Sequence, residues 1–229
     1  MSNSGLLKSS IARKVAMALS AFFLMIFLLQ HFAINITSVF SAGVFNQLSH
    51  FMGTNVVVQY VFQPILIFGV IFHFVMGFIL EIKNRNSREV RYVKYKGGAS
   101  ASWMSRNMIL SGLVILAFLG LHFYDFWFPE IKTKFIDGDW SGALTEGGEP
   151  IRYFDHLIHK FHNPVRVALY CVAFILLALH LLHGFMSAFQ SVGANNKYTK
   201  ALQKFGVAYA ILIPLGFVFI ALFHHFNHY

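Results

Sequence analysis

The sequence predicts an all-α membrane protein in which five transmembrane helices form a single domain (1–229). Only 12% of the 229 residues are charged and 57% are hydrophobic, whereas about a quarter of the residues in a soluble domain are charged. The apolar residues form five runs of about 20 residues, long enough to cross about 30 Å of hydrocarbon. Most charged residues lie between these runs. We therefore expect a multi-pass protein in a lipid bilayer.

The expected spans are 15–36, 56–80, 108–128, 165–189 and 206–226. The first follows the stretch MSNSGLLKSSIARK and has no small-residue cleavage site after it, so we expect a retained helix rather than a removed signal peptide. The second and fifth spans contain no Asp, Glu, Lys or Arg, and the third and fourth contain one such residue each, Asp125 and Arg166. Each run is therefore apolar enough to be a transmembrane helix.

The net charge of +9 indicates membrane topology rather than nucleic-acid binding. The first connection (37–55) has no Lys or Arg, whereas the other side is rich in them. By the positive-inside rule, the N-terminus is cytoplasmic and the C-terminus is outside. The basic residues lie in the N-terminal arm (Lys8, Arg13, Lys14), the second connection (Lys83, Arg85, Arg88, Arg91, Lys94, Lys96, Arg106) and the fourth connection (Lys197, Lys200, Lys204).

Four spans each carry a histidine deep in the apolar run: His31, His73, His122 and His180. An imidazole in hydrocarbon is costly, so such a residue usually has a partner and a function. With this topology and a rise of about 1.5 Å per residue, His31 and His122 fall at one depth near the outer face. His73 and His180 fall at a second depth nearer the cytoplasm. Four helices forming a bundle with two such pairs predict two haem irons, each held by two axial histidines.

Small residues near these histidines leave room for a flat porphyrin, although glycines also pack transmembrane helices generally. Gly77 and Gly184 each follow a histidine by four residues, and Gly120 precedes one by two. The chain has no CxxCH motif, so haem would be held without covalent attachment. The lone Cys171 excludes a disulfide framework and a thiolate cluster.

Four further residues are candidates for cofactor contacts. Arg106 and His183 are candidates for binding haem propionates, and His183 is also an alternative ligand or an interfacial residue. Asp125 and His50 are candidates for a quinone site near the outer face. Asp125 could equally be an interfacial polar residue in the aromatic belt, and His50 could equally be a surface residue.

The remaining histidines are expected at the outer surface. The stretch HLIHKFH (156–162) predicts an amphipathic segment at the outer interface. Its spacing alone permits a metal site, but no nearby cysteine or deep carboxylate completes one. The C-terminal His224, His225 and His228 are expected to be solvated.

Several stretches around these histidines resemble a known family. They are LLQHFAIN, IFHFVMGF, ASWMSRNMILSG leading to FLGLHFYDFW, and LLALHLLHGFMSAFQSVG. The chain resembles the single-polypeptide, di-haem cytochrome b subunit of succinate:quinone oxidoreductases (succinate dehydrogenase and fumarate reductase), of the five-helix type that uses menaquinone. The resemblance covers nearly the whole chain, and the last stretch and SRNMILSG are its most specific parts.

This resemblance implies two b haems, with ligands paired between the first and third spans and between the second and fourth. It also implies a flavoprotein subunit and an iron–sulfur subunit on the cytoplasmic side of a bacterial cytoplasmic (inner) membrane. Menaquinone or another quinone would be the substrate of the complex. The dicarboxylate chemistry would belong to the flavoprotein, so this chain itself would carry no catalytic residue for it.

The sequence departs from some fumarate reductases of this group, which carry two membrane glutamates. Ala178 stands two residues before the last proposed ligand, and no carboxylate lies between Gln30 and Leu80. Proton transfer through such glutamates is therefore in doubt here.

Two other classes of protein remain: the cytochrome b subunit of a hydrogenase or formate dehydrogenase, and a haem-free transporter with a histidine relay. The relay predicts acidic residues among the deep histidines, and these are almost absent.

Overall fold

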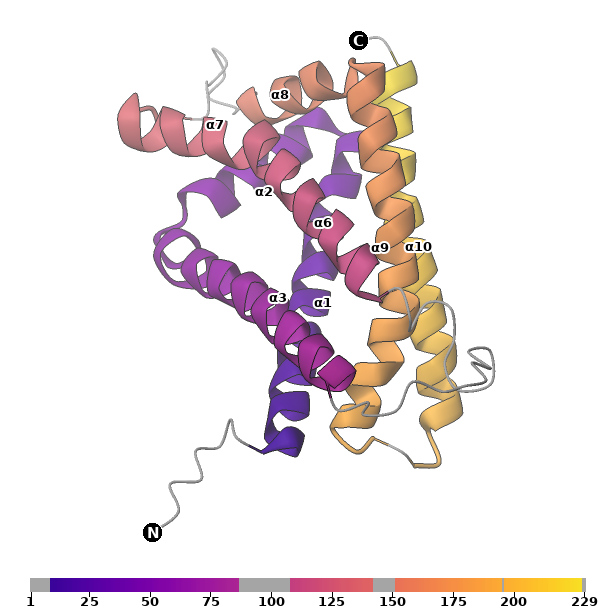
Figure 1. Cartoon of the computed structure of the whole chain (residues 1–229). Coiled ribbons are helices and arrows are strands. Elements are labelled where there is room, and N and C mark those ends of the chain that lie inside the picture. The colour runs from indigo at the N-terminus through magenta and orange to yellow at the C-terminus, as the bar shows by residue number, and fades with distance from the viewer. Residues whose placement is uncertain (1–8, 87–107, 142–150, 195, 228–229) are drawn as a thin grey trace.

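Five long helices run between the two ends of the molecule in the computed structural model, which describes residues 9–86, 108–141, 151–194 and 196–227 (Figure 1). Within these ranges the chain is helical and contains no β-strand. All five helices are long and apolar enough to span a membrane. The predicted all-α, five-span fold is therefore confirmed.

The continuous helical stretches are longer than the predicted spans, and capping residues mark several of their ends. Ser9 caps α1, Ser41 ends α1 and caps α2, and Asn163 caps α9 just before Pro164. The spanning helices are α1 (Ser10–Phe40), α3 (Gln63–Asn86), α6 (Met108–His122), α9 (Pro164–Ser191) and α10 (Thr199–Phe226). The span that contains α3 begins at Val58, and the one that contains α6 continues to Ile136. The shorter helices are α2 (Ala42–Thr54), α7 (Phe128–Ile131) and α8 (Arg152–Phe161), and π-helical turns occupy Val58–Phe62, Phe123–Trp127 and Lys132–Ile136.

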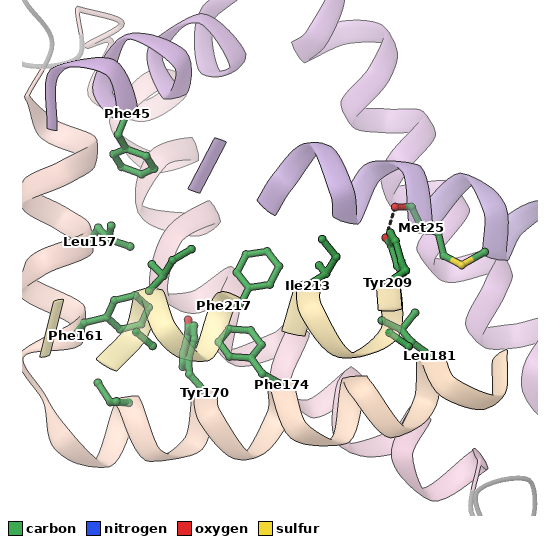
Figure 2. Close-up of a cluster of buried hydrophobic side chains, with 14 of the residues drawn as sticks. Met25, Phe45, Leu157, Phe161, Tyr170, Phe174, Leu181, Tyr209, Ile213 and Phe217 are labelled. Atoms are coloured by element: carbon green, nitrogen blue, oxygen red, sulfur yellow. Dashed lines mark hydrogen bonds between the residues drawn. The ribbon is translucent and has the colours of Figure 1, made fainter. Parts of the chain in front are cut away.

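Helices α9 and α10 pack side by side, and α1 contacts both of them (Figure 1). Figure 2 shows the resulting core, in which Phe174 of α9 stacks on Phe217 of α10 with ring centroids 5.3 Å apart. The hydroxyl of Tyr209 donates a hydrogen bond to the Met25 carbonyl of α1, which satisfies a buried polar group. Helix α3 lies mainly against α1, and α6 lies mainly against α9. This packing brings the four histidine-bearing helices into one bundle.

Large apolar side chains cover the outside of the spanning helices. Ile26 is 71% exposed, Phe68 68% and Leu212 64%. Apolar surface of this extent is unfavourable in water but suits the hydrocarbon of a bilayer, where helices satisfy their own backbone groups. The arrangement supports contact between the spanning helices and lipid.

Helix α1 begins at one end of the molecule and α10 ends at the other, with α2, α7 and α8 at the latter end (Figure 1). The connection between α9 and α10 lies at the end where α1 begins. Much of the basic second connection, including Arg106, lies outside the described residues. Which end faces the cytoplasm therefore stays a prediction of the basic-residue pattern.

That orientation can be tested by labelling single cysteines in intact cells. Asn196 and Asn227 are exposed and flank the two ends of α10. In a Cys171→Ala background, a membrane-impermeant thiol reagent should label Asn227→Cys and should not label Asn196→Cys until the membrane is permeabilised. Equal labelling of both positions would contradict the five-span topology, and the reverse pattern would contradict the orientation.

Candidate functional site

The four deep histidines meet as two pairs at two levels of the bundle. The ring centroids of His31 and His122 are 5.7 Å apart, with the ring planes inclined at 84°. Those of His73 and His180 are 6.5 Å apart and inclined at 67°. The structure thus brings together the pairs that were expected from depth, α1 with α6 and α3 with α9.

The spacing of both pairs fits two imidazoles that share one iron. With metal–nitrogen bonds of about 2 Å on each side, the two ring centroids should lie about 6 Å apart. The observed 5.7 Å and 6.5 Å bracket this value. Among the described residues, no group of three or more His, Cys, Asp or Glu comes together, but an axial haem pair requires only two protein ligands. The donor set therefore fits haem iron.

A serine hydroxyl orients the ring of His73. The Oγ of Ser20 lies 3.0 Å from Nδ1 of His73 and also donates a hydrogen bond to the Met17 carbonyl at 2.8 Å. Because the hydroxyl hydrogen points to that carbonyl, the oxygen is left to accept a hydrogen bond from Nδ1–H. Nε2 of His73 then carries the free lone pair, the form in which imidazole ligates a metal.

His180 has the same arrangement. The Oγ of Ser111 lies 3.1 Å from Nδ1 of His180 and donates to the Met108 carbonyl at 2.9 Å. Gly112 adjoins this ring, since a Cβ at that position would lie 3.8 Å from Cε1 of His180. The two rings of the inner pair are therefore held alike, each by a serine from a neighbouring helix.

Sequence reasoning missed both serines. Ser111 lies within the SRNMILSG stretch, but its pairing with a residue 69 positions away could be found only from the helix packing. Ser20 lies 53 positions from His73 and had no signal beyond being a polar residue in an apolar span.

The pair of His31 and His122, which is predicted to be the outer one, lies among aromatic rings instead of serine hydroxyl groups. Phe27 stacks on His31 with centroids 5.5 Å apart, and Phe118 stacks on His122 at 5.9 Å. The amide of Asn35 is 3.4 Å and 3.5 Å from the two ring nitrogens of His31, but it donates its shorter bond, 2.8 Å, to the His31 carbonyl. Nδ1 of His122 is buried and makes no hydrogen bond with any described residue.

Asp125 lies in the π-helical turn that follows His122, and its side chain is completely buried. Its carboxylate is 2.9 Å from Arg166 and 3.8 Å from Lys160, and it accepts a hydrogen bond from the hydroxyl of Tyr170 at 2.9 Å. This set is the Asp125 cluster. The side chain is therefore not exposed in an aromatic belt, and its contacts tie α6 to α8 and α9.

The local backbone explains part of this arrangement. Pro129 stands four residues after Asp125 and has no N–H to donate to the Asp125 carbonyl. Nε2 of His156, on α8, lies 2.6 Å from that oxygen and donates the missing hydrogen bond. Helix α8 is amphipathic as predicted, with Leu157, Ile158 and Phe161 buried.

His50 contacts Tyr153 at the end of the molecule where α10 ends. The rings of His50 on α2 and Tyr153 on α8 are 6.1 Å apart, and Nδ1 of His50 lies 3.4 Å from the Tyr153 hydroxyl. Burial, and then the negative charge of Glu130, raise the pKa of Tyr153, so its phenol stays protonated and able to donate. Unlike Asp125, His50 is partly exposed.

A cluster of charged side chains lies next to Tyr153, whose ring centroid is 5.5 Å from the Arg152 guanidinium. The Lys134 side chain, only 2% exposed, pairs with Glu130 at 3.1 Å and donates to the Gly53 carbonyl at 2.6 Å. Arg152 bridges Glu130 at 2.9 Å and Asp139 at 2.7 Å. This outer ion cluster (Glu130, Lys134, Asp139, Arg152) joins α2 and α8 to the end of the third span.

The other candidate histidines fall in different places. His183 lies one turn beyond His180 on α9, and the ring that faces His73 is that of His180. The expectation that His224 is solvated is wrong: it is 0% exposed, and its Nε2 lies 2.8 Å from the Ser38 hydroxyl. The reason is that the last turn of α10 packs against α1 and does not reach solvent at His224. His228, like Arg106, lies outside the described residues.

Comparisons of the chain with protein-family models, with curated proteins and with solved structures found no match.

Proposed function

We propose that this chain is the membrane anchor and electron-transfer subunit of a succinate:quinone oxidoreductase, a di-haem cytochrome b of the menaquinone-linked, five-helix type. The observation that carries the proposal is the two histidine pairs at two depths, with ring centroids 5.7 Å and 6.5 Å apart. The resemblance of the stretches around the same four histidines supports the choice of family.

In this proposal, His31 and His122 would hold an outer haem b, and His73 and His180 would hold an inner haem b. Bound there, the two haems would carry single electrons across about 30 Å of hydrocarbon in short steps. The chain's own residues fix the geometry of each site. The contacts of Ser20 and Ser111 with Nδ1 leave Nε2 of the inner histidines free to hold iron, while Phe27 and Phe118 pack on the outer rings.

A flavoprotein subunit and an iron–sulfur subunit would dock on the cytoplasmic side of a bacterial inner membrane, where the basic connections predict the inner end of the bundle. Succinate oxidation or fumarate reduction would take place in the flavoprotein. Electrons would pass between the iron–sulfur subunit and the inner haem. Arg106 and His183 remain candidates for contact with haem propionates. The sequence predicts both residues near the cytoplasmic ends of their spans.

The quinone would bind near the outer haem, and the contacts favour His50 over Asp125 as the residue that meets it. The Asp125 carboxylate is already engaged, because it pairs with the partly exposed Arg166 and accepts a hydrogen bond from the buried Tyr170. His50 is partly exposed and contacts the protonated hydroxyl of Tyr153. Met52, two residues further along α2, contacts the Gln30 amide at 3.6 Å. Because Gln30 adjoins His31, this segment of α2 lies at the level of the outer pair.

The quinone assignment predicts a change in substrate binding without a change in haem. His50→Leu should raise the KM for the quinone severalfold while the haem content of the complex stays the same. His159→Leu, a change of the same kind at an exposed position of α8, is the matched control. An unchanged KM in His50→Leu, together with a raised KM in Asp125→Asn, would move the site to Asp125.

The proposed function is tested by purifying the chain from its native membrane with whatever subunits accompany it and recording dithionite-reduced minus oxidised spectra. We expect two b haems per chain and co-purification of a flavoprotein and an iron–sulfur protein. Haem with hydrogenase or formate dehydrogenase subunits would favour that other class of cytochrome b. A complex without haem absorbance would favour the histidine relay.

A further inference from the structure

The two serine–histidine contacts of the inner pair have the same construction. Ser20 reaches from α1 to His73 on α3, and Ser111 reaches from α6 to His180 on α9. In both, the hydroxyl also donates to the carbonyl three residues earlier in its own helix, at 2.8 Å and 2.9 Å. The hydroxyl hydrogen is thereby occupied, and the oxygen faces the Nδ1 atom of a histidine on another helix.

We propose that Ser20 and Ser111 are positioning residues that select the Nδ1–H tautomer of the two inner histidines and lower the reduction potential of the inner haem. This inference rests on the proposed function, since it concerns the haem held by His73 and His180. It assigns a specific role to Ser111 of the SRNMILSG stretch.

The expected direction follows from the electronic effect of the hydrogen bond. When one nitrogen of an imidazole donates its N–H to an oxygen, the other nitrogen of the ring becomes more basic. A more basic axial ligand stabilises ferric iron more than ferrous iron, so the reduction potential falls. When the hydroxyl is removed, the potential of the inner haem should rise.

The outer pair provides the contrast within the same molecule. Nδ1 of His122 makes no hydrogen bond with any described residue, and the contacts of Asn35 with the ring of His31 are long, at 3.4 Å and 3.5 Å. The loss of either serine should therefore act on the inner haem alone. A purely structural role, in which each serine only satisfies its own hydroxyl within an apolar helix, would leave both potentials unchanged.

The test is an anaerobic redox titration of the haem absorbance in the purified full complex, comparing the wild type with Ser20→Ala and Ser111→Ala. We expect one titrating component to shift to a more positive potential in each variant and the other to stay in place. Ser20→Thr and Ser111→Thr, which keep the hydroxyl, should restore the wild-type potential. Electron paramagnetic resonance of the ferric haems should show a changed low-spin signal for the same component only.

Ser38→Ala is the matched control, because Ser38 also donates to a carbonyl three residues earlier and contacts a histidine, His224, that is not a proposed ligand. It should leave the inner component unchanged. Loss of the inner haem in the alanine variants but not in the threonine variants would support the positioning role.

Three outcomes would overturn the inference: unchanged potentials in both alanine variants, equal shifts of both components, or failure of threonine to restore what alanine changes. A wild-type complex that contains no haem would instead overturn the proposed function itself, so the two failures are distinguishable.

Discussion

Replacing His73 with alanine is expected to remove the inner haem and to leave the outer haem bound, so that the haem content of the chain falls by about half. Its partner, His180, lies across the bundle with its ring 6.5 Å away. One imidazole cannot hold a six-coordinate iron from both sides. The measurement is haem per chain from the pyridine haemochrome spectrum, together with a redox titration that identifies the component lost.

The pairing makes this prediction stricter than the loss of a haem alone. His180→Ala should remove the same titrating component as His73→Ala, and the double variant should lose no more than either single variant. His31→Ala and His122→Ala should both remove the other component. If the variants of two paired histidines lost different haem components, the pairs would be wrongly assigned.

His183→Ala provides a close comparison for the ligand on α9. The ring that faces His73 is that of His180, and His183 lies one turn further along. We expect His183→Ala to keep both haems and His180→Ala to lose the inner one. The reverse result would make His183 the ligand.

Asp125→Ala is expected to destabilise the end of the bundle where α8 lies. It would remove the carboxylate that lies 2.9 Å from Arg166 and 3.8 Å from Lys160 and that accepts from Tyr170. Breaking a fully buried ion pair costs about 3–5 kcal/mol because the remaining charge is left unpaired. Because Arg166 and Lys160 are partly exposed, water can screen them, and we expect a smaller loss of about 2–3 kcal/mol.

The free energy of unfolding in detergent, measured by thermal or denaturant unfolding, checks this value. Asp155→Ala is the control, because Asp155 is exposed on α8. The outer haem should also bind less tightly, since Asp125 lies in the turn that follows His122. If Asp125→Ala unfolded like the wild type but abolished quinone reduction, Asp125 would have a quinone-site role rather than a structural one.

The sequence by itself determined the fold class, the five spans and the partners of the four deep histidines. Hydrocarbon permits few polar side chains, so each histidine in an apolar run stood out. The fixed rise of a helix then converted the position of each histidine along its span into a depth. Because neighbouring spans run in opposite directions, two depths were enough to predict His31 with His122 and His73 with His180.

Only the tertiary structure decided which side chains of neighbouring helices come into contact. The contacts of Ser20 with His73, of Ser111 with His180 and of Ser38 with His224 join residues that are 53, 69 and 186 positions apart. Hydropathy gives the depth of a residue but not the rotation of its helix about the axis. For the same reason, a single acidic residue near the end of a span could not be distinguished from an interfacial one. The packing of α6, α8 and α9 buried Asp125 and brought Arg166, Lys160 and Tyr170 to its carboxylate.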